Sequence, residues 1–148
     1  MTVNQQVLAF ASSKFGQTVG GGECFDLADR ALRAAGALSA ADYGELTPNA
    51  DYEWGLAVML SSVQPGDIIQ FSNYSYRIDH ADSWEEHSRP HHTAIVAAVG
   101  QNGAITVYEQ NVGTGSGARR VQRNQLYFQN TRSITVSGSF RFFRPQER

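Results

Sequence analysis

The chain has 148 residues, of which 41% are hydrophobic and 18% are charged, and its formal net charge is −2. A chain of this size and composition is typical of one folded domain that buries roughly two-thirds of its unfolded surface. Because no apolar run approaches the roughly 20 residues that a membrane span needs, we expect one domain over residues 1–148 and no membrane partner.

Two helices are predicted in the first part of the chain. Apolar residues at three- and four-residue steps predict a short amphipathic helix over residues 2–15, and a glycine-containing loop follows over residues 16–22. The strongest helical pattern covers residues 23–35, where leucines and alanines share one face, and Gly36 is a plausible end.

From residue 37 onward the pattern changes to turns and strands. Residues 37–64 are less regular, with a short helix or strand over residues 54–60. The expected elements that follow are a turn at 65–66, a strand over 67–71, a polar loop over 72–91, a buried strand over 93–99, a hairpin turn at 101–103, a returning strand over 104–110, a flexible turn at 113–117, and strands near 119–122 and 133–143. Helices followed by an antiparallel meander indicate an α+β fold.

The charge is distributed unevenly along the chain. Residues 1–88 carry twelve acidic and four basic side chains, whereas residues 89–148 carry eight basic and two acidic ones. The arginines of the second half could line a groove for an anionic partner, but we favour ion pairs with the acidic half. Aromatic residues are not interleaved with these arginines, so we expect no nucleic-acid partner.

Cys24 is the one cysteine of the chain and stands where the second predicted helix begins. Unpaired backbone N–H groups at a helix N-terminus favour negative charge, and the thiolate is the nucleophilic form of cysteine. The position therefore indicates a nucleophile, although a lone cysteine is also commonly a small buried hydrophobe. A single cysteine excludes an intrachain disulfide and leaves the redox compartment open.

A thiol nucleophile needs a base within hydrogen-bond reach and a group that orients the base. His92 opens the buried strand, and a hairpin centred near Asn102 places it beside the end of the returning strand. At that end Glu109, Gln110 or Asn111 could accept a hydrogen bond from the imidazole. Alternation places Glu109 and Asn111 on one face and Gln110 on the other.

Other polar and aromatic residues are weaker candidates. His91 is interpreted as a loop residue or part of a substrate rim, since neighbouring strand residues face opposite ways. Trp84, inside the polar loop, is a candidate for a substrate groove, whereas Trp54 fits the core better. The acidic and histidine residues of 72–91 lack the spacing of a metal site, so we expect no metal and no cofactor, and we interpret this loop as a lid or specificity element.

Four blocks of the sequence together resemble the signature blocks of CHAP domains, which belong with the NlpC/P60 cysteine peptidases in a papain-like superfamily. The blocks are Gly22–Leu27, Val63–Phe71, His92–Val96 and Ile105–Asn111, in the family's order. The resemblance implies a papain-like α+β fold, with N-terminal helices packed on an antiparallel sheet or half-barrel. It also implies a nucleophile at Cys24, a base at His92, and acidic and amide partners at Glu109 and Asn111.

The same resemblance implies cleavage of amide or peptide bonds, commonly in peptidoglycan, by an amidase or endopeptidase. We expect the backbone N–H of Cys24 to stabilise the oxyanion, with Gln17 as the candidate for a second donor. The family often has glutamine where Glu23 stands, and a negative charge there opposes thiolate formation unless it points to solvent. The long 72–91 segment is a further departure.

Alternatives remain open at this point. The substrate is either peptidoglycan peptides or a protein, with isopeptide or acyl groups as the second choice, and a non-catalytic binding module on the same scaffold is the third reading. We expect a monomer, with an immunity or inhibitor protein as a possible partner. Because Met1–Gln6 does not resemble a secretory signal, we expect a cytoplasmic location or export by a non-classical route, as in phage lysis or secretion-system delivery, unless a leader is absent from the sequence.

Overall fold

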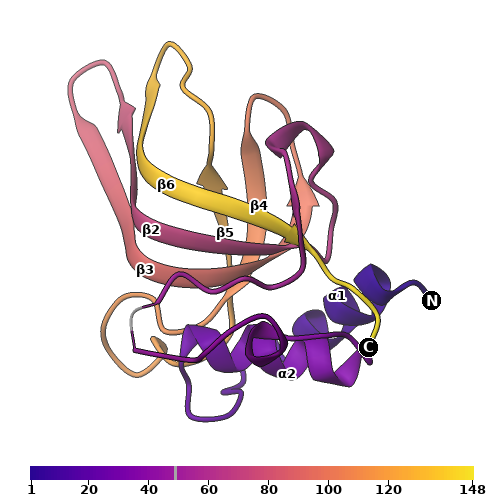
Figure 1. The fold of residues 1–148 in the computed structure, drawn as a ribbon. Helices are drawn as coiled ribbons and strands as arrows, with labels where there is room; N and C mark the ends of the chain where they lie inside the picture. The colour runs from indigo at the N-terminus through magenta and orange to yellow at the C-terminus, as the bar shows by residue number, and fades with distance from the viewer. Residues whose placement is uncertain (49) are drawn as a thin grey trace.

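A computed structural model describes residues 1–48 and 50–148, and it has two helices and a six-stranded sheet (Figure 1). The helices are α1 (Val3–Ser13) and α2 (Cys24–Ala34), and short 3₁₀ turns cover Ala40–Asp42 and Leu60–Ser62. The strands are β1 (Leu56–Val58), β2 (Ile68–Asp79), β3 (Trp84–Val99), β4 (Ala104–Glu109), β5 (Gln122–Tyr127) and β6 (Ile134–Arg144). All paired neighbours in the order β1-β6-β2-β3-β4-β5 are antiparallel, which confirms the α+β class.

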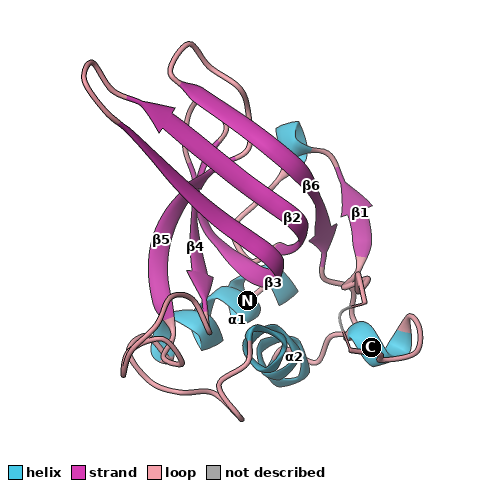
Figure 2. Ribbon diagram, turned by 90° about the vertical axis from the view of Figure 1, so that its left-hand side faces the viewer, coloured by secondary structure: helices cyan, strands magenta, loops and turns pink. Residues whose placement is uncertain are grey.

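The two helices form a layer below the sheet in Figure 1, and Figure 2 shows the same arrangement from the side. Helix α1 begins with a capping box in which the backbone N–H of Gln5 donates to the Thr2 hydroxyl and its side chain accepts from the Thr2 backbone. In α2 the predicted apolar face is buried. Its members are Leu27, Ala28, Ala31 and Leu32. The helical pattern is therefore confirmed by its packing.

Two clusters of buried side chains lie on opposite faces of the sheet. The first joins both helices to one face and includes Trp54, Ile95 and Phe143. The second covers the other face and is rich in aromatic rings, among them Phe71 and Phe142. Trp54 is fully buried, as expected for a core residue, and its indole N–H donates to Gln70 Oε1 at 2.8 Å.

The prediction of a polar loop over residues 72–91 is wrong. Most of this segment belongs to the hairpin formed by β2 and β3. The two strands pair from Ile68↔Ile95 out to Asp79↔Trp84. In β2 the side chains of Tyr74 and Tyr76 are buried, while Arg77 is exposed, so part of this segment does alternate. The first residues of β3 are exposed and, apart from Trp84, polar, and their strand conformation follows from backbone pairing with β2 rather than from a hydrophobic pattern.

Other boundaries agree better with expectation. The turn between β3 and β4 has positive φ at both Asn102 and Gly103, at 56° and 78°, as an Asn-Gly hairpin turn requires. The strand expected near 119–122 is an exception and its position is wrong, because the strand is β5 at Gln122–Tyr127, where a mostly polar sequence pairs with β4 and buries Leu126. The uncertain segment 54–60 contains the short strand β1.

Ion pairs connect the acidic and basic halves of the chain. Arg119 pairs with Glu23, Arg144 with Asp67, and these contacts measure 2.7 Å and 2.8 Å. Two further pairs of the same kind are Arg141–Glu53 and Arg148–Asp42. The interleaving of the two halves is therefore the observed arrangement for these arginines. Within residues 1–48 and 50–148, no helix is long and apolar enough to cross a bilayer.

Candidate active site

The segment before α2 delivers Cys24 to the first position of the helix. Two glycines in this segment have positive φ, 58° at Gly20 and 86° at Gly22. A Cβ at Gly20 would lie 2.9 Å from Asp26 Cγ, and one at Gly22 would lie 2.9 Å from Arg119 Cβ. Glycine is needed here both for the backbone conformation and for close packing.

Hydrogen bonds fix this segment to the end of β4. Gln110 is fully buried, and its amide oxygen accepts from the backbone N–H of Val19 at 2.8 Å. The amide nitrogen of Gln110 donates to the carbonyls of Val19 at 3.0 Å and Glu23 at 2.8 Å. Of the candidates for orienting the imidazole, Gln110 therefore faces the residues that precede Cys24 instead.

His92 lies in β3 and has both Glu109 and Cys24 as hydrogen-bond partners. The ring is 4% exposed, and its Nε2 is 2.9 Å from Glu109 Oε1. Burial lowers the pKa of His92, but hydrogen bonds with Cys24 and Glu109 and their negative charges outweigh burial, so the pKa is raised above its ordinary value. With Nε2 committed to Glu109, Nδ1 is the nitrogen left for proton exchange with the partly exposed thiol.

Glu109 is held by more groups than the imidazole alone. Its carboxylate is fully buried and accepts two hydrogen bonds from Arg89, each at 2.9 Å, and one from Asn124 Nδ2 at 2.8 Å. Burial raises the pKa of Glu109, but the hydrogen bonds from His92 and Arg89 lower it by a larger amount. The pKa of Glu109 is therefore below its ordinary value. The group that orients His92 is thus a charged carboxylate with all of its strong contacts inside the fold.

Asn111 reaches a different partner from the one that the family resemblance implied. It follows β4 with φ of 67°, and its amide donates to Glu23 Oε2 at 3.0 Å. Arg119 donates to the other oxygen of Glu23 at 2.7 Å. The half-exposed Glu23 carboxylate beside Cys24 is therefore compensated by a cation and an amide, which reduces its opposition to a thiolate.

Gln17 does not lie among the described contacts of the Cys24–His92 pair. Its amide donates to the Ser13 carbonyl at 3.3 Å. The side chain lines a pocket of about 430 Å³ together with Lys14 and Arg30. The sequence distance to Cys24 alone had suggested an oxyanion donor, and this structure places that amide on another contact.

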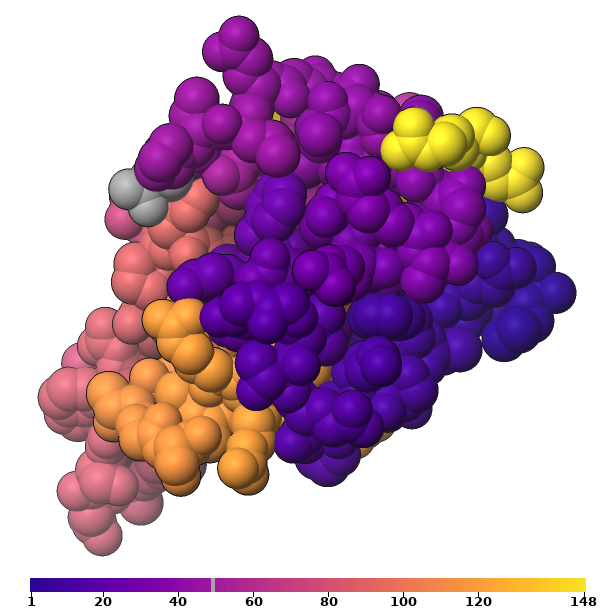
Figure 3. All heavy atoms as spheres, turned by 90° about the horizontal axis from the view of Figure 1, so that it is seen from below, coloured from indigo at the N-terminus to yellow at the C-terminus, as the bar shows by residue number. Residues whose placement is uncertain are grey.

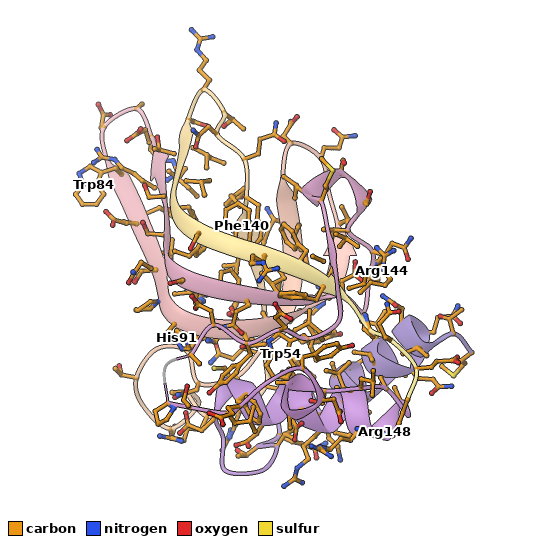
Figure 4. The ribbon with its side chains drawn as sticks, viewed as in Figure 1. Trp54, Trp84, His91, Phe140, Arg144 and Arg148 are labelled. Atoms are coloured by element: carbon orange, nitrogen blue, oxygen red, sulfur yellow. The ribbon has the colours of Figure 1, made fainter. Side chains whose placement is uncertain are left out.

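The two proposed substrate-binding residues lie at different places along β3: Trp84 is its first residue, and His91 is in the middle of the strand (Figure 4). Trp84 is at the tip of the β2–β3 hairpin, 55% exposed, with the Arg77 guanidinium 4.4 Å from its ring centre. His91 lies where the sheet meets the helical layer, with Nε2 3.4 Å from Asp51 Oδ1. His91 is therefore near the thiol region, whereas Trp84 is not.

Two aromatic rings to which the sequence analysis gave no role, Phe25 directly after Cys24 in α2 and Tyr52, pack together and against the core residue Trp54. The Phe25 ring is 5.2 Å from Tyr52 and 5.2 Å from Trp54. The pKa of Tyr52 is raised, first by burial and then by the negative charge of Cys24, and its hydroxyl donates to the Thr47 carbonyl at 2.6 Å. Tyr52 falls in the irregular segment 37–64, where no spacing marked it as a neighbour of the nucleophile.

A pocket of about 450 Å³ lies behind the carboxylate, between the β2–β3 hairpin and β5. Arg89 and Asn124, which both bond Glu109, form part of its wall, and Tyr76 and His87 form another part. Figure 3 shows the N-terminal residues, in indigo and violet, covering the lower end of the molecule beside the orange segment that follows β4. In the part of the chain that the structure describes, no three His, Cys, Asp or Glu residues are arranged to hold a metal ion.

Comparison with known proteins gives one match. The family model described as the AIM3/BBC1 cysteine proteinase-fold domain matches residues 1–148. No curated protein and no solved structure matches the chain significantly. The match supports the papain-like fold expected from the sequence, but not the CHAP or NlpC/P60 families in particular. The chain belongs to the AIM3/BBC1 cysteine proteinase-fold domain family.

Proposed function

We propose that this domain is a cysteine hydrolase that cleaves amide bonds, with Cys24 as nucleophile, His92 as base and Glu109 as the orienting group. The observation that carries the proposal is the buried contact of 2.9 Å between His92 Nε2 and Glu109 Oε1, on an imidazole that also hydrogen-bonds Cys24. Nucleophile, base and orienting acid in this order are the parts of a cysteine protease site.

The proposed reaction follows from these positions. Nδ1 of His92 takes the proton of Cys24, and the thiolate attacks the amide carbonyl to form a tetrahedral intermediate. The backbone N–H of Cys24, at the start of α2, donates to the oxyanion. The C–N bond breaks as His92 protonates the leaving amine, and a water then hydrolyses the thioester. For Gln17 to be the second oxyanion donor, its amide must exchange Ser13 for the substrate.

Two substrate classes follow from different observations. Peptidoglycan peptides are the first candidate, because the four blocks around Cys24, His92 and Glu109 resemble those of CHAP domains. Proteins with isopeptide or acyl-linked groups are the second, because the matching family is described as having a cysteine proteinase fold. Both substrates present an amide or acyl carbon to the same thiolate.

The test compares the wild-type protein with Cys24→Ala, His92→Ala and His87→Ala. Digests of peptidoglycan and of a protein mixture are analysed by mass spectrometry, and alkylation of Cys24 by iodoacetamide is timed at neutral pH. We expect products from the wild type, none from Cys24→Ala, and a rate lower by about 10²–10⁴-fold in His92→Ala. His87→Ala, which removes an exposed histidine of the same strand, should match the wild type.

The outcomes distinguish a peptidoglycan hydrolase, a protein hydrolase and a non-catalytic binding module. New muropeptides identify peptidoglycan and the bond, and new protein termini identify a protein substrate. Full activity in Cys24→Ala would contradict the mechanism. A wild-type thiol that iodoacetamide modifies no faster than a free cysteine, together with no products, would replace the hydrolase by a non-catalytic binding module.

A further inference from the structure

Arg89 is a buried cation that the reaction outlined above does not use directly. It lies in β3, three residues before His92, and its side chain is 10% exposed. Its Nε and Nη2 each donate to one oxygen of Glu109 at 2.9 Å, and its Nη1 donates to the Ser88 carbonyl at 2.9 Å. This is the planar two-point contact for which arginine, unlike lysine, is suited.

The contact fixes where Glu109 can point. A carboxylate with both oxygens held by one guanidinium loses the freedom to rotate, and Asn124 holds the Oε2 atom as well. The remaining direction at Oε1 is taken by His92 Nε2. The imidazole that faces Cys24 is therefore oriented through a chain that ends at Arg89.

The contact between Arg89 and Glu109 also reduces the electrostatic effect of the Glu109 carboxylate on the His92 imidazole. Glu109 alone would favour a protonated His92, and the positive charge of Arg89 opposes that effect across the shared carboxylate. The titratable or charged groups around His92 and Arg89 are Cys24 from α2, Glu109 from β4, and Tyr74 and Tyr76 from β2. Among His92, Arg89 and these described groups, Arg89 is the one fixed cation.

We propose that Arg89 is a positioning residue of this site, which locks the Glu109 carboxylate against His92 and keeps the imidazole able to release its proton at neutral pH. This inference rests on the proposed function of Cys24 and His92. The sequence around Arg89 carries no motif that marks it, and its role follows from the two-point contact alone.

The experiment titrates His92 by NMR of its ring in a Cys24→Ala background, so that it does not depend on activity. The compared proteins carry Arg89→Gln, Arg89→Lys, Asn124→Ala or no further change, and far- and near-UV circular dichroism confirms that each is folded. We expect Arg89→Gln to move the His92 titration to higher pH. Arg89→Lys keeps the charge and should stay closer to the parent, and Asn124→Ala, which removes a neutral donor, should move it least.

A second measurement places the same Arg89 and Asn124 variants in the chain with Cys24 intact. Alkylation of Cys24 by iodoacetamide across pH should slow by about 10²-fold in Arg89→Gln, since a misplaced base costs that much. Arg89→Lys should also be slower, because it lacks the fork that fixes Glu109. Arg89→Lys keeps the buried positive charge opposite Glu109, and it keeps the test decisive if Arg89→Gln does not fold.

The outcomes distinguish this inference from the proposed function. If the wild-type thiol is no more reactive than free cysteine and no substrate is cleaved, the proposed function is contradicted, whether or not the Arg89 variants change the titration of His92. If the wild type is active but folded Arg89 variants titrate and react like their parents, Arg89 is a structural residue only and the inference is overturned.

Discussion

Two histidine–carboxylate contacts in this protein have nearly the same length but opposite surroundings. His92 Nε2 is 2.9 Å from Glu109, with side-chain exposures of 5% and 0%. At the hairpin tip His87 Nε2 is 2.9 Å from Glu85, with exposures of 45% and 48%. Water screens the second pair and is excluded from the first, so equal distances carry very different energies.

The partners of the two carboxylates widen this difference. Glu85 bonds a second exposed histidine, His80, at 3.0 Å, and any of these side chains can exchange its partner for water. Glu109 has Arg89 on both oxygens, and neither group has solvent to replace the other. A contact length therefore identifies a functional site only together with burial and the number of fixed partners.

The largest expected effect comes from removing the buried charge. Glu109→Gln keeps the shape of the side chain but leaves Arg89 without its anion, and we expect a loss of about 3–5 kcal/mol in the free energy of unfolding. The matched variant Glu85→Gln should unfold at the parent urea concentration. Urea unfolding followed by tryptophan fluorescence measures both, and an equal loss in the two variants would show that burial does not separate the pairs.

The next effect is on the pH dependence of stability. The folded pKa of Glu109 is lowered below its ordinary 4.5, so its contribution is present above that pH and is lost as the pH falls through the folded value. The folded pKa of His92 is raised above 6.5, so its contribution is fully present below that pH and is lost as the pH rises through the folded value. Stability should therefore decline at both ends of the range.

Unfolding midpoints from pH 3 to pH 9 measure this profile. We expect Glu109→Gln to flatten the acidic side and His92→Gln to flatten the alkaline side. The exposed histidine variant His87→Gln should leave both sides as they are. A profile that His87→Gln changes as much as His92→Gln does would contradict the comparison.

The smallest effect concerns salt. Exposed pairs weaken when added ions shorten the screening distance from about 10 Å at 0.1 M to about 3 Å at 1 M, whereas buried pairs are screened much less. NMR titrations of the two carboxylates at both ionic strengths should therefore raise the pKa of Glu85, which its exposed histidine partners lower, and leave the pKa of Glu109 nearly unchanged. A salt-dependent change in the pKa of Glu109 as large as that of Glu85 would mean that water reaches Glu109.

Much of the fold was predictable because local patterns marked it. The apolar face of α2 and the Asn102–Gly103 turn both had the spacing or residue type that their structures require. From that turn, the strand pairing that brings His92 to Glu109 could be counted along the chain. The outer half of β3 could not be predicted, because its polar residues are held by backbone bonds to β2.

The candidate site was predictable to the same degree. Cys24 and His92 were marked by a helix start and a strand start, and the structure brings them together around Glu109. Arg89 and Asn124 were missed, since charged and amide residues in strands usually face solvent and only the folded geometry shows these two turned inward. Period-2 alternation also failed at Asn111, where positive φ ends the strand geometry.

The end of β4 supports both reacting groups of the proposed site. Glu109 and Gln110 are consecutive residues, and the first holds the imidazole of His92 while the second holds the carbonyl beside Cys24. Because Glu109 ends β4 and Gln110 follows it directly, we expect a displacement of this end of β4 to move the supports of Cys24 and His92 together. On warming, we expect Cys24 and His92 to stay aligned until β4 detaches, so the proposed hydrolysis should be lost abruptly rather than gradually.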